Sequence, residues 1–236
     1  MIPREFQQSI AAVQQAIGHE FREPLLLLEA LTHKSFHHEN RKLAGAYNER
    51  LEFLGDSVIG LIIVESLFLH EKKYDESILA KLKSYLVSEP VFAKLALSLG
   101  LGEALLLGKG ESSTGGRRKP SILANVFESV VGAVYLDAGF DRAKEIVLGM
   151  FLPIIGRSIK ENAFSDSKTE LQERTQAEFG CLPEYRVITE QGVEHERVFT
   201  VAVYLSGKKL ATASGKRKKE AEALAAKKAL LKMEKK

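Results

Sequence analysis

Apolar residues between Phe6 and about Ile159 recur at three- and four-residue intervals, with few alternating stretches. This spacing predicts one α-helix after another. The helices are expected at residues 3–17, 24–31, 48–72, 76–87, 90–99, 121–138 and 141–160. Pro3, Pro24 and Pro90 suit the first turns of three of them, because the N–H that proline lacks has no partner within a helix there. The first part of the chain, residues 1–160, is therefore predicted to be an all-α domain.

The pattern changes after this helical part. Ser167 and Glu170 have the spacing of a capping box and open a helix at 167–179. Alternating apolar and polar residues then predict strands at 185–189, 198–205 and 209–214, and a last helix is expected at 216–233. The order helix, three antiparallel strands, helix predicts a small α+β domain at residues 167–236. The polar residues 161–166 form the expected linker.

Composition narrows the class of protein. The 236 residues are 45% hydrophobic and 28% charged, which is ordinary globular usage. The longest apolar runs end at a glutamate far short of the roughly 18 residues that a membrane span needs, so neither a transmembrane helix nor a membrane partner is expected. The N-terminus lacks the apolar stretch of a secretory signal, and Cys181 is the single cysteine. We therefore expect a cytoplasmic protein in which Cys181 is a small buried or half-buried hydrophobic residue.

Charge is distributed unevenly along the chain. Residues 1–165 carry 19 basic and 20 acidic side chains, whereas residues 166–236 carry 15 basic and 11 acidic ones. Nine of these basic side chains lie within residues 216–236. This end of the chain is predicted to bind an anion, with a polyanion as the first candidate.

An acidic stripe marks the helix expected at 48–72. At about 100° per residue, Glu49, Glu52 and Asp56 fall within an arc of roughly 60° on a helix that is otherwise apolar nearly all round. Grouped carboxylates repel one another and lose hydration when they are buried. A hard divalent cation such as Mg²⁺ compensates them well, because it prefers oxygen ligands.

Further oxygen donors lie elsewhere on the helical part. Asn125 and Glu128 are three residues apart on another apolar helix and so share a face, and Glu76 is an acidic candidate near a helix start. The competing interpretation is that each acid is a solvated or ion-paired surface residue. That interpretation is weakest for the three carboxylates on one apolar helix.

Several stretches together resemble the bacterial ribonuclease III family. Residues 48–58, Asn-Glu-Arg-Leu-Glu-Phe-Leu-Gly-Asp-Ser-Val, look like the family signature, and residues 31–36, 108–111, 115–118 and 121–132 resemble family stretches in the expected order. Residues 167–233 resemble a double-stranded-RNA-binding domain. The resemblance covers nearly the whole chain, and its eleven-residue signature is highly specific.

The resemblance implies a Mg²⁺-dependent endoribonuclease, with Mn²⁺ as the alternative ion, that hydrolyses both strands of duplex RNA. The implied enzyme leaves 5′-phosphate and 3′-hydroxyl ends and acts as a homodimer, with Phe53 packed across the interface. The resemblance also implies roles in ribosomal RNA precursor processing and RNA decay. Asp56 and Glu128 are the implied catalytic pair. The implied metal ligands are Glu49, Glu52, Asp56, Glu76, Asn125 and Glu128.

One departure from the family pattern keeps an alternative open. The family often has Asp where this chain has Asn125, and an amide oxygen can coordinate a metal but brings no negative charge. A non-cleaving regulator that only binds double-stranded RNA is the rival function. The presence of the five acids together argues against it.

The resemblance also implies which side chains of the second domain contact RNA. Such domains read the shape of A-form RNA over roughly 16 bp, through 2′-hydroxyl and phosphate contacts. The implied contacts come from the first helix, a loop between strands and the start of the last helix: Gln172, Glu173, Gln176, His195, Lys216, Arg217, Lys218 and Lys219. Glu222 stands where many such domains have a further Lys, so it is expected to weaken that edge of the contact.

Other constellations are rejected. His33 and His37 could share a metal, but no third ligand and no His-Glu-x-x-His motif accompanies them, so a zinc site is not expected. The glycine-rich segments lack Walker A spacing, which excludes a nucleotide cofactor of that kind, and Ser57 lacks a nucleophile elbow. The basic residues at 117–119 are interpreted either as RNA contacts or as a solvated loop.

Overall fold

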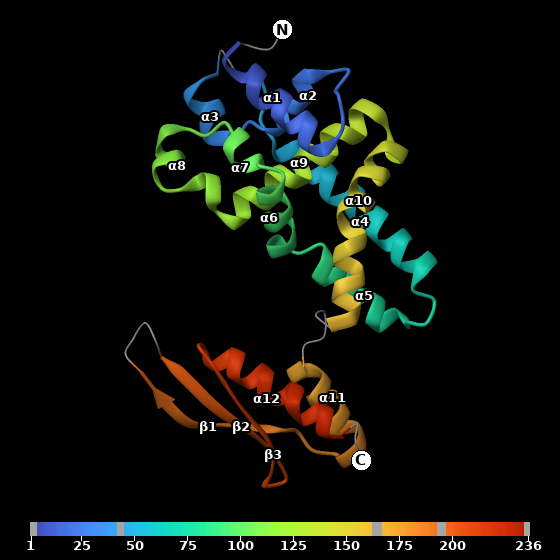
Figure 1. The fold of residues 1–236 in the computed structure, drawn as a ribbon, viewed down its shortest axis with the longest axis vertical. Helices are drawn as coiled ribbons and strands as arrows, with labels where there is room; N and C mark the ends of the chain where they lie inside the picture. The colour runs from blue at the N-terminus through green and yellow to red at the C-terminus, as the bar shows by residue number, and fades with distance from the viewer. Residues whose placement is uncertain (1–3, 42–44, 162–166, 193–196, 234–236) are drawn as a thin grey trace. The chain divides into compact units, whose positions relative to one another are not determined.

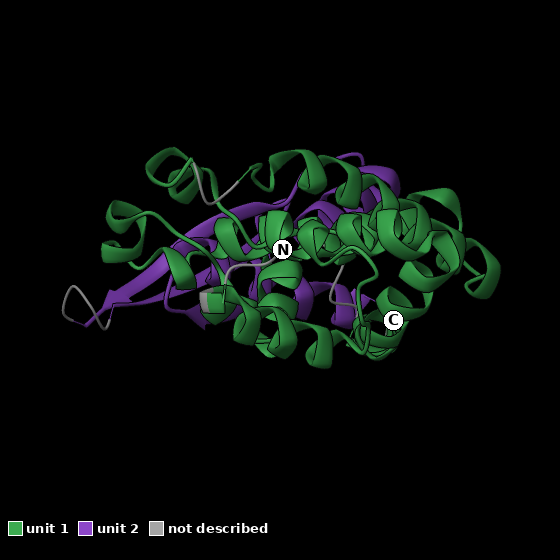
Figure 2. Cartoon of the chain, turned by 90° about the horizontal axis from the view of Figure 1, so that it is seen from above, with its two compact units in different colours: residues 1–164 green, residues 165–236 purple. Residues whose placement is uncertain are grey.

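The computed structural model describes residues 4–41, 45–161, 167–192 and 197–233. The chain divides into two compact units, residues 1–164 and 165–236, which Figure 2 colours separately. The first is helical, and the second has the order helix, three antiparallel strands, helix. The predicted fold class is confirmed.

The first unit is a bundle of helices around one apolar core (Figure 1). Its elements are α1 (Arg4–Ile17), α2 (Pro24–Ala30), α3 (Lys34–Glu39), α4 (Glu49–His70), α5 (Glu76–Leu86), α6 (Glu89–Ser98), α7 (Leu101–Ala104), α8 (Lys109–Ser113), the 3₁₀ turn η1 (Gly116–Arg118), α9 (Pro120–Ala138) and α10 (Phe140–Glu161). The short elements α3, α7, α8 and η1 were not predicted, because three to six residues are too few to show a helical period.

Two long apolar helices, α4 and α9, lie side by side at the centre of this unit. Around them the large buried side chains interlock: the ring of Phe92 on α6 lies 5.4 Å from that of Phe127 on α9, and Phe151 on α10 completes the cluster at 6.3 Å from both. Such close packing fixes the helices rigidly. The rest of the bundle thus serves to hold α4 against α9.

Both central helices are long and apolar enough to cross a membrane by length and composition alone. Uninterrupted apolar runs in these helices are short, but the mean hydropathy over 18 residues is high because it averages over the occasional glutamate. In α9 the window is 67% buried inside the protein, as in the core helix of a soluble protein; in α4 it is 39% buried. More of α4 than of α9 is therefore exposed on the surface of this unit.

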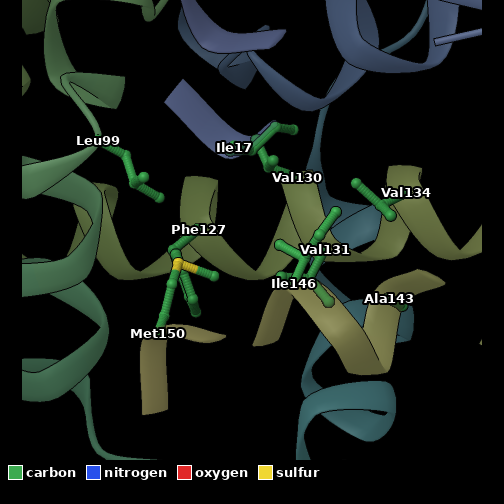
Figure 3. A pocket seen from close by; sticks show the side chains of 9 residues that line it. All are labelled: Ile17, Leu99, Phe127, Val130, Val131, Val134, Ala143, Ile146 and Met150. Atoms are coloured by element: carbon green, nitrogen blue, oxygen red, sulfur yellow. The ribbon is translucent and has the colours of Figure 1, made fainter. Parts of the chain in front are cut away.

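A small hollow lies beneath α9, on the side of Phe127 and Val131 (Figure 3). It measures about 10 Å³, and every side chain that lines it is apolar. A void of this size is at the lower limit for one water molecule and offers it no polar partner. This hollow is a packing defect of the core and not a ligand site.

The second unit carries α11 (Ser167–Phe179) and α12 (Lys218–Met233) on one face of an antiparallel sheet (Figure 1). The sheet has the order β1 (Glu184–Gln191), β2 (Val198–Leu205) and β3 (Lys208–Gly215). Alanines of α12 are fully buried against Val203, Ala211 and Ala213 of the sheet. Because alanine is small, α12 can lie close to the strands. The last helix begins two residues later than predicted, so Lys216 and Arg217 precede it.

Candidate active site and RNA-binding surface

The start of α4 is fixed by backbone hydrogen bonds. The N–H of the buried residue Asn48 donates to the carbonyl of Thr32 (2.9 Å), and the N–H of Glu52 donates to the carbonyl of Asn48 (2.9 Å). The predicted acidic stripe follows from this point: Glu49 and Asp56 are exposed, and Glu52 is half-buried.

The second half of the site comes from α9, which carries Asn125 and Glu128, both half-buried. The fully buried Ser129 joins the two helices, because its hydroxyl lies 2.6 Å from the carbonyl oxygen of Asn125 and 3.2 Å from that of Asn48. The residue next to Glu128 therefore ties α9 to the first residue before α4.

Two glycines allow α4 and α9 to touch backbone to backbone. A Cβ on Gly55 would lie 1.9 Å from the carbonyl oxygen of Glu128, and a Cβ on Gly132 would lie 2.4 Å from that of Leu51. No side chain fits in either place without moving a helix. This crossing places Glu52 and Asp56 of α4 opposite Glu128 of α9.

Electrostatics confirm that these carboxylates are close together. Burial, together with the negative charges of Asp56 and Glu52, raises the pKa of Glu128 to about 8. Burial and the charge of Glu49 also raise the pKa of Glu52, against the opposing effects of Lys34 and of a hydrogen bond from Asn125. The four residues Glu52, Asp56, Asn125 and Glu128 thus form one cluster, which we call the acidic site.

Asn125 plays a distinct part in the acidic site. A carboxylate can only accept hydrogen bonds, so the amide NH₂ of Asn125 is the donor to Glu52. Its carbonyl oxygen is then the group left for a cation. An aspartate here would add a further negative charge and could not donate in this way unless protonated.

The donor chemistry of the acidic site suits a hard divalent cation: three carboxylates and an amide oxygen, with mutual repulsion that a cation would relieve. In the side-chain conformations of the structure, no three His, Cys, Asp or Glu among the described residues have the spacing of a metal site. Side-chain rotation about fixed helices is therefore needed to form one.

Glu49 stands at the edge of the acidic site. Its carboxylate pairs with the ammonium of Lys34 at 3.1 Å, and both side chains are about half exposed. Lys34, the first residue of α3, was not singled out from the sequence, because nothing in a linear pattern connects it to Glu49. Arg50, the residue next to Glu49, acts on Glu29.

Glu76 does not join the acidic site within one chain. It begins α5, beside Leu67 and Phe68 in the second half of α4. Fifteen residues of helix separate Glu52 from Leu67, which is roughly 22 Å at 1.5 Å per residue. Glu76 could share a site with the other acids only across an interface between two copies of the chain.

Phe53 lies on α4 with its side chain pointing away from the core. It is 79% exposed, so it does not belong to the core of this unit. Leu61, Val64 and Phe68 of the same helix are also exposed. They form an apolar strip with Phe53 that explains why α4 is less buried than α9.

The basic loop before α9 is only partly available for RNA. The guanidinium of Arg117 donates to the carbonyls of Gly102, Glu103 and Leu105 at 2.8–3.0 Å, and Lys119 pairs with Glu111 at 2.5 Å. These two residues hold the loop together. Arg118 is exposed.

On the second unit, the glutamines implied as RNA contacts share the exposed face of α11. Gln172 and Gln176 are exposed, whereas Leu171 and Thr175 of the same helix are buried. Glu173 is exposed as well. His195 lies outside the described residues.

The basic segment Lys216, Arg217, Lys218 and Lys219 is exposed throughout. The N–H of Lys216 donates to the carboxylate of Glu220 (2.9 Å), so an acidic side chain already caps this turn.

Glu222 was expected to weaken this edge of the RNA contact, and the structure shows that its charge has a partner within the domain. Its carboxylate is 11% exposed and pairs with Lys168 of α11 at 2.7 Å. The pair ties α11 to α12 and neutralises the charge, so Glu222 does not present a free anion to RNA.

Comparison with known proteins agrees with this arrangement. Residues 23–155 match the profile described as Ribonuclease-III-like, and residues 167–233 match that of the Double-stranded RNA binding motif. The chain is 42% identical to Ribonuclease 3 of Pelotomaculum thermopropionicum, over 96% of this chain and 94% of that protein. It is 43% identical to Ribonuclease 3 of Helicobacter pylori strain 26695, over 95% and 92%.

A solved structure is similar to the first unit. It is the nuclease domain of ribonuclease III from Campylobacter jejuni, 45% identical, with a TM-score of 0.56 over 60% of this chain and 94% of that one. Its description refers to flexibility in a region involved in dimer formation.

Proposed function

Since the chain belongs to the ribonuclease III family and is a double-strand-specific endoribonuclease, we propose that its acidic site uses Mg²⁺ to hydrolyse phosphodiesters in both strands of duplex RNA. The products carry 5′-phosphate and 3′-hydroxyl ends. The observation that carries this proposal is the meeting of Glu52 and Asp56 with Glu128 across the glycine crossing.

Glu52, Asp56 and Glu128 would hold the cation, with Asn125 as an oxygen donor. When bound, Mg²⁺ supplies a stronger nucleophile at neutral pH and stabilises charge on the phosphate oxygens; Mn²⁺ can supply the same chemistry. The carboxyl of Glu128 holds a proton near neutral pH because its pKa is about 8, so this proton must leave before Glu128 can act as a ligand. The hydrogen bond from Asn125 orients Glu52 toward the same position.

A homodimer is the second part of the proposal. The strip of Phe53, Leu61, Val64 and Phe68 exposes large side chains along one face of α4, and a contiguous apolar surface of this kind marks a contact with another macromolecule. A second copy of the same helix is the simplest complement, because a twofold axis pairs a surface with itself. Two acidic sites in one dimer could then each meet one strand of a duplex.

The second unit supplies binding without sequence readout. Its exposed Gln172, Gln176 and basic residues at 216–219 suit phosphate and 2′-hydroxyl groups. We place the protein in the cytoplasm, with roles in ribosomal RNA precursor processing and RNA decay.

The experiment is cleavage of a long end-labelled RNA duplex with Mg²⁺ or with EDTA, beside a single strand of the same sequence. We expect duplex cleavage only with metal, and products that a 5′-phosphate-dependent exonuclease degrades. Products with 5′-hydroxyl ends would contradict the chemistry proposed, and cleavage undiminished in EDTA would contradict the metal.

A further inference from the structure

We propose that Lys34 binds a phosphate of the RNA backbone beside the acidic site, exchanging its present partner Glu49 for the substrate. The inference rests on the proposed function and adds to it a residue that recognises the substrate. Its ammonium lies 3.1 Å from the carboxylate of Glu49, at the solvent edge of the acidic site.

The backbone that carries Lys34 is fixed on two sides. The N–H of the preceding residue, His33, donates to the carbonyl of Leu106 (3.0 Å), and the carbonyl of Thr32 accepts from the N–H of Asn48 (2.9 Å). The ring of His33 caps α3 by accepting from the N–H of Ser35 (3.2 Å). The backbone at Lys34 is therefore held in place, whereas its flexible four-carbon side chain can turn toward a ligand.

The charge around the acidic site leaves this role to Lys34. Lys34 is a cation that acts on both Glu49 and Glu52. Two basic side chains of the loop before α9 are held elsewhere: Lys119 by Glu111, and Arg117 by backbone carbonyls. Carboxylates repel an approaching phosphodiester. A metal ion offsets this negative charge inside the acidic site, and a cation is also needed at its outer edge.

The exchange costs little. Both partners of the pair are about half exposed, and surface ion pairs of this kind contribute little to stability. Once Lys34 contacts a phosphate, the carboxylate of Glu49 becomes available to the cation. Binding of RNA and completion of the acidic site are thereby coupled.

The test is the salt dependence of duplex binding in Ca²⁺ buffer, with Lys34→Gln, Lys34→Arg and the wild-type protein. The logarithm of the binding constant falls as the logarithm of the salt concentration rises, and each lost phosphate contact makes this slope less steep by about 0.9. We expect the slope to fall by about that amount for every subunit that contacts the duplex in Lys34→Gln, and to stay unchanged in Lys34→Arg. Lys144→Gln is the matched control. It breaks another ion pair to α4, in which Lys144 of α10 lies 2.5 Å from Glu65 of α4.

A second measurement separates phosphate binding from a scaffold role. Without RNA, Lys34→Gln should bind Mn²⁺ at least as tightly as the wild-type protein, because a competing cation has been removed. A wild-type salt slope in Lys34→Gln, or weaker Mn²⁺ binding, would overturn the inference. Failure of the wild-type protein to cleave duplex RNA would instead overturn the proposed function.

Discussion

The glycine crossing of α4 and α9 makes a demanding prediction for Gly132→Ala. A Cβ at this position would lie 2.4 Å from the carbonyl oxygen of Leu51, and ordinary contact begins at 3.4 Å. The helices must therefore separate by about 1 Å. Overpacking of this kind costs about 1–3 kcal/mol. Misplacement of reacting groups by about 1 Å can lower a rate by roughly 10²-fold.

The assay for Gly132→Ala is single-turnover cleavage of a duplex at saturating Mg²⁺, together with thermal unfolding. We expect a protein that remains folded, unfolds at lower temperature and cleaves roughly 100-fold more slowly, because Glu128 has moved away from Glu52 and Asp56. Gly55→Ala should be worse, since its Cβ would lie only 1.9 Å from the carbonyl oxygen of Glu128.

The control is Gly149→Ala in α10, an exposed helical glycine whose Cβ would meet nothing within 4 Å. It should keep full activity and gain up to about 1 kcal/mol of stability from helix propensity. If Gly132→Ala cleaved at the wild-type rate, the claim that the crossing sets the geometry of the acidic site would be wrong.

Three further predictions concern other parts of the account. Glu128→Gln should abolish cleavage and keep RNA binding in Ca²⁺ buffer. Because folding raises the pKa of Glu128 to about 8, the metal-free native state binds a proton that the unfolded state has lost, so wild-type stability should fall as the pH rises from about 4.5 to 8. Melting curves of Glu128→Gln should show a smaller fall over the same pH range. Lys218→Ala with Lys219→Ala should weaken duplex binding and flatten its salt dependence, and an unchanged slope would move the phosphate contact elsewhere. Phe53→Ala with Phe68→Ala should shift sedimentation from dimer toward monomer; dimers that persist at micromolar concentration would place the interface on another surface.

The sequence was most informative where a residue's role depends on its own helix. The faces of α4 and α9 follow from helical spacing, so the grouping of Glu52 with Asp56 and of Asn125 with Glu128 could be predicted. That these two groups meet depends on two glycines whose contacts lie more than 70 residues away in the chain. No local pattern reveals such a contact; only the family resemblance suggested it.

Long-range pairing explains what the sequence did not reveal. Glu222 was considered from the sequence only as an edge of the RNA contact, whereas the fold pairs it with Lys168, 54 residues away. Lys34 has no distinguishing neighbours in sequence, yet the fold brings it to Glu49. Glu76 resembled a ligand by position, although the length of α4 separates it from the acids of its own chain. In each case the missing information was which partner the fold supplies.

The most direct test of the central claim is Mn²⁺ binding, measured by electron paramagnetic resonance, to the wild-type protein and to Asp56→Asn and Glu128→Gln. If one site is built from both α4 and α9, each substitution alone should remove the same class of bound ion, and Glu145→Gln on the exposed face of α10 should remove none. Retention of wild-type Mn²⁺ binding in either Asp56→Asn or Glu128→Gln would show that the two helices do not form a single metal site.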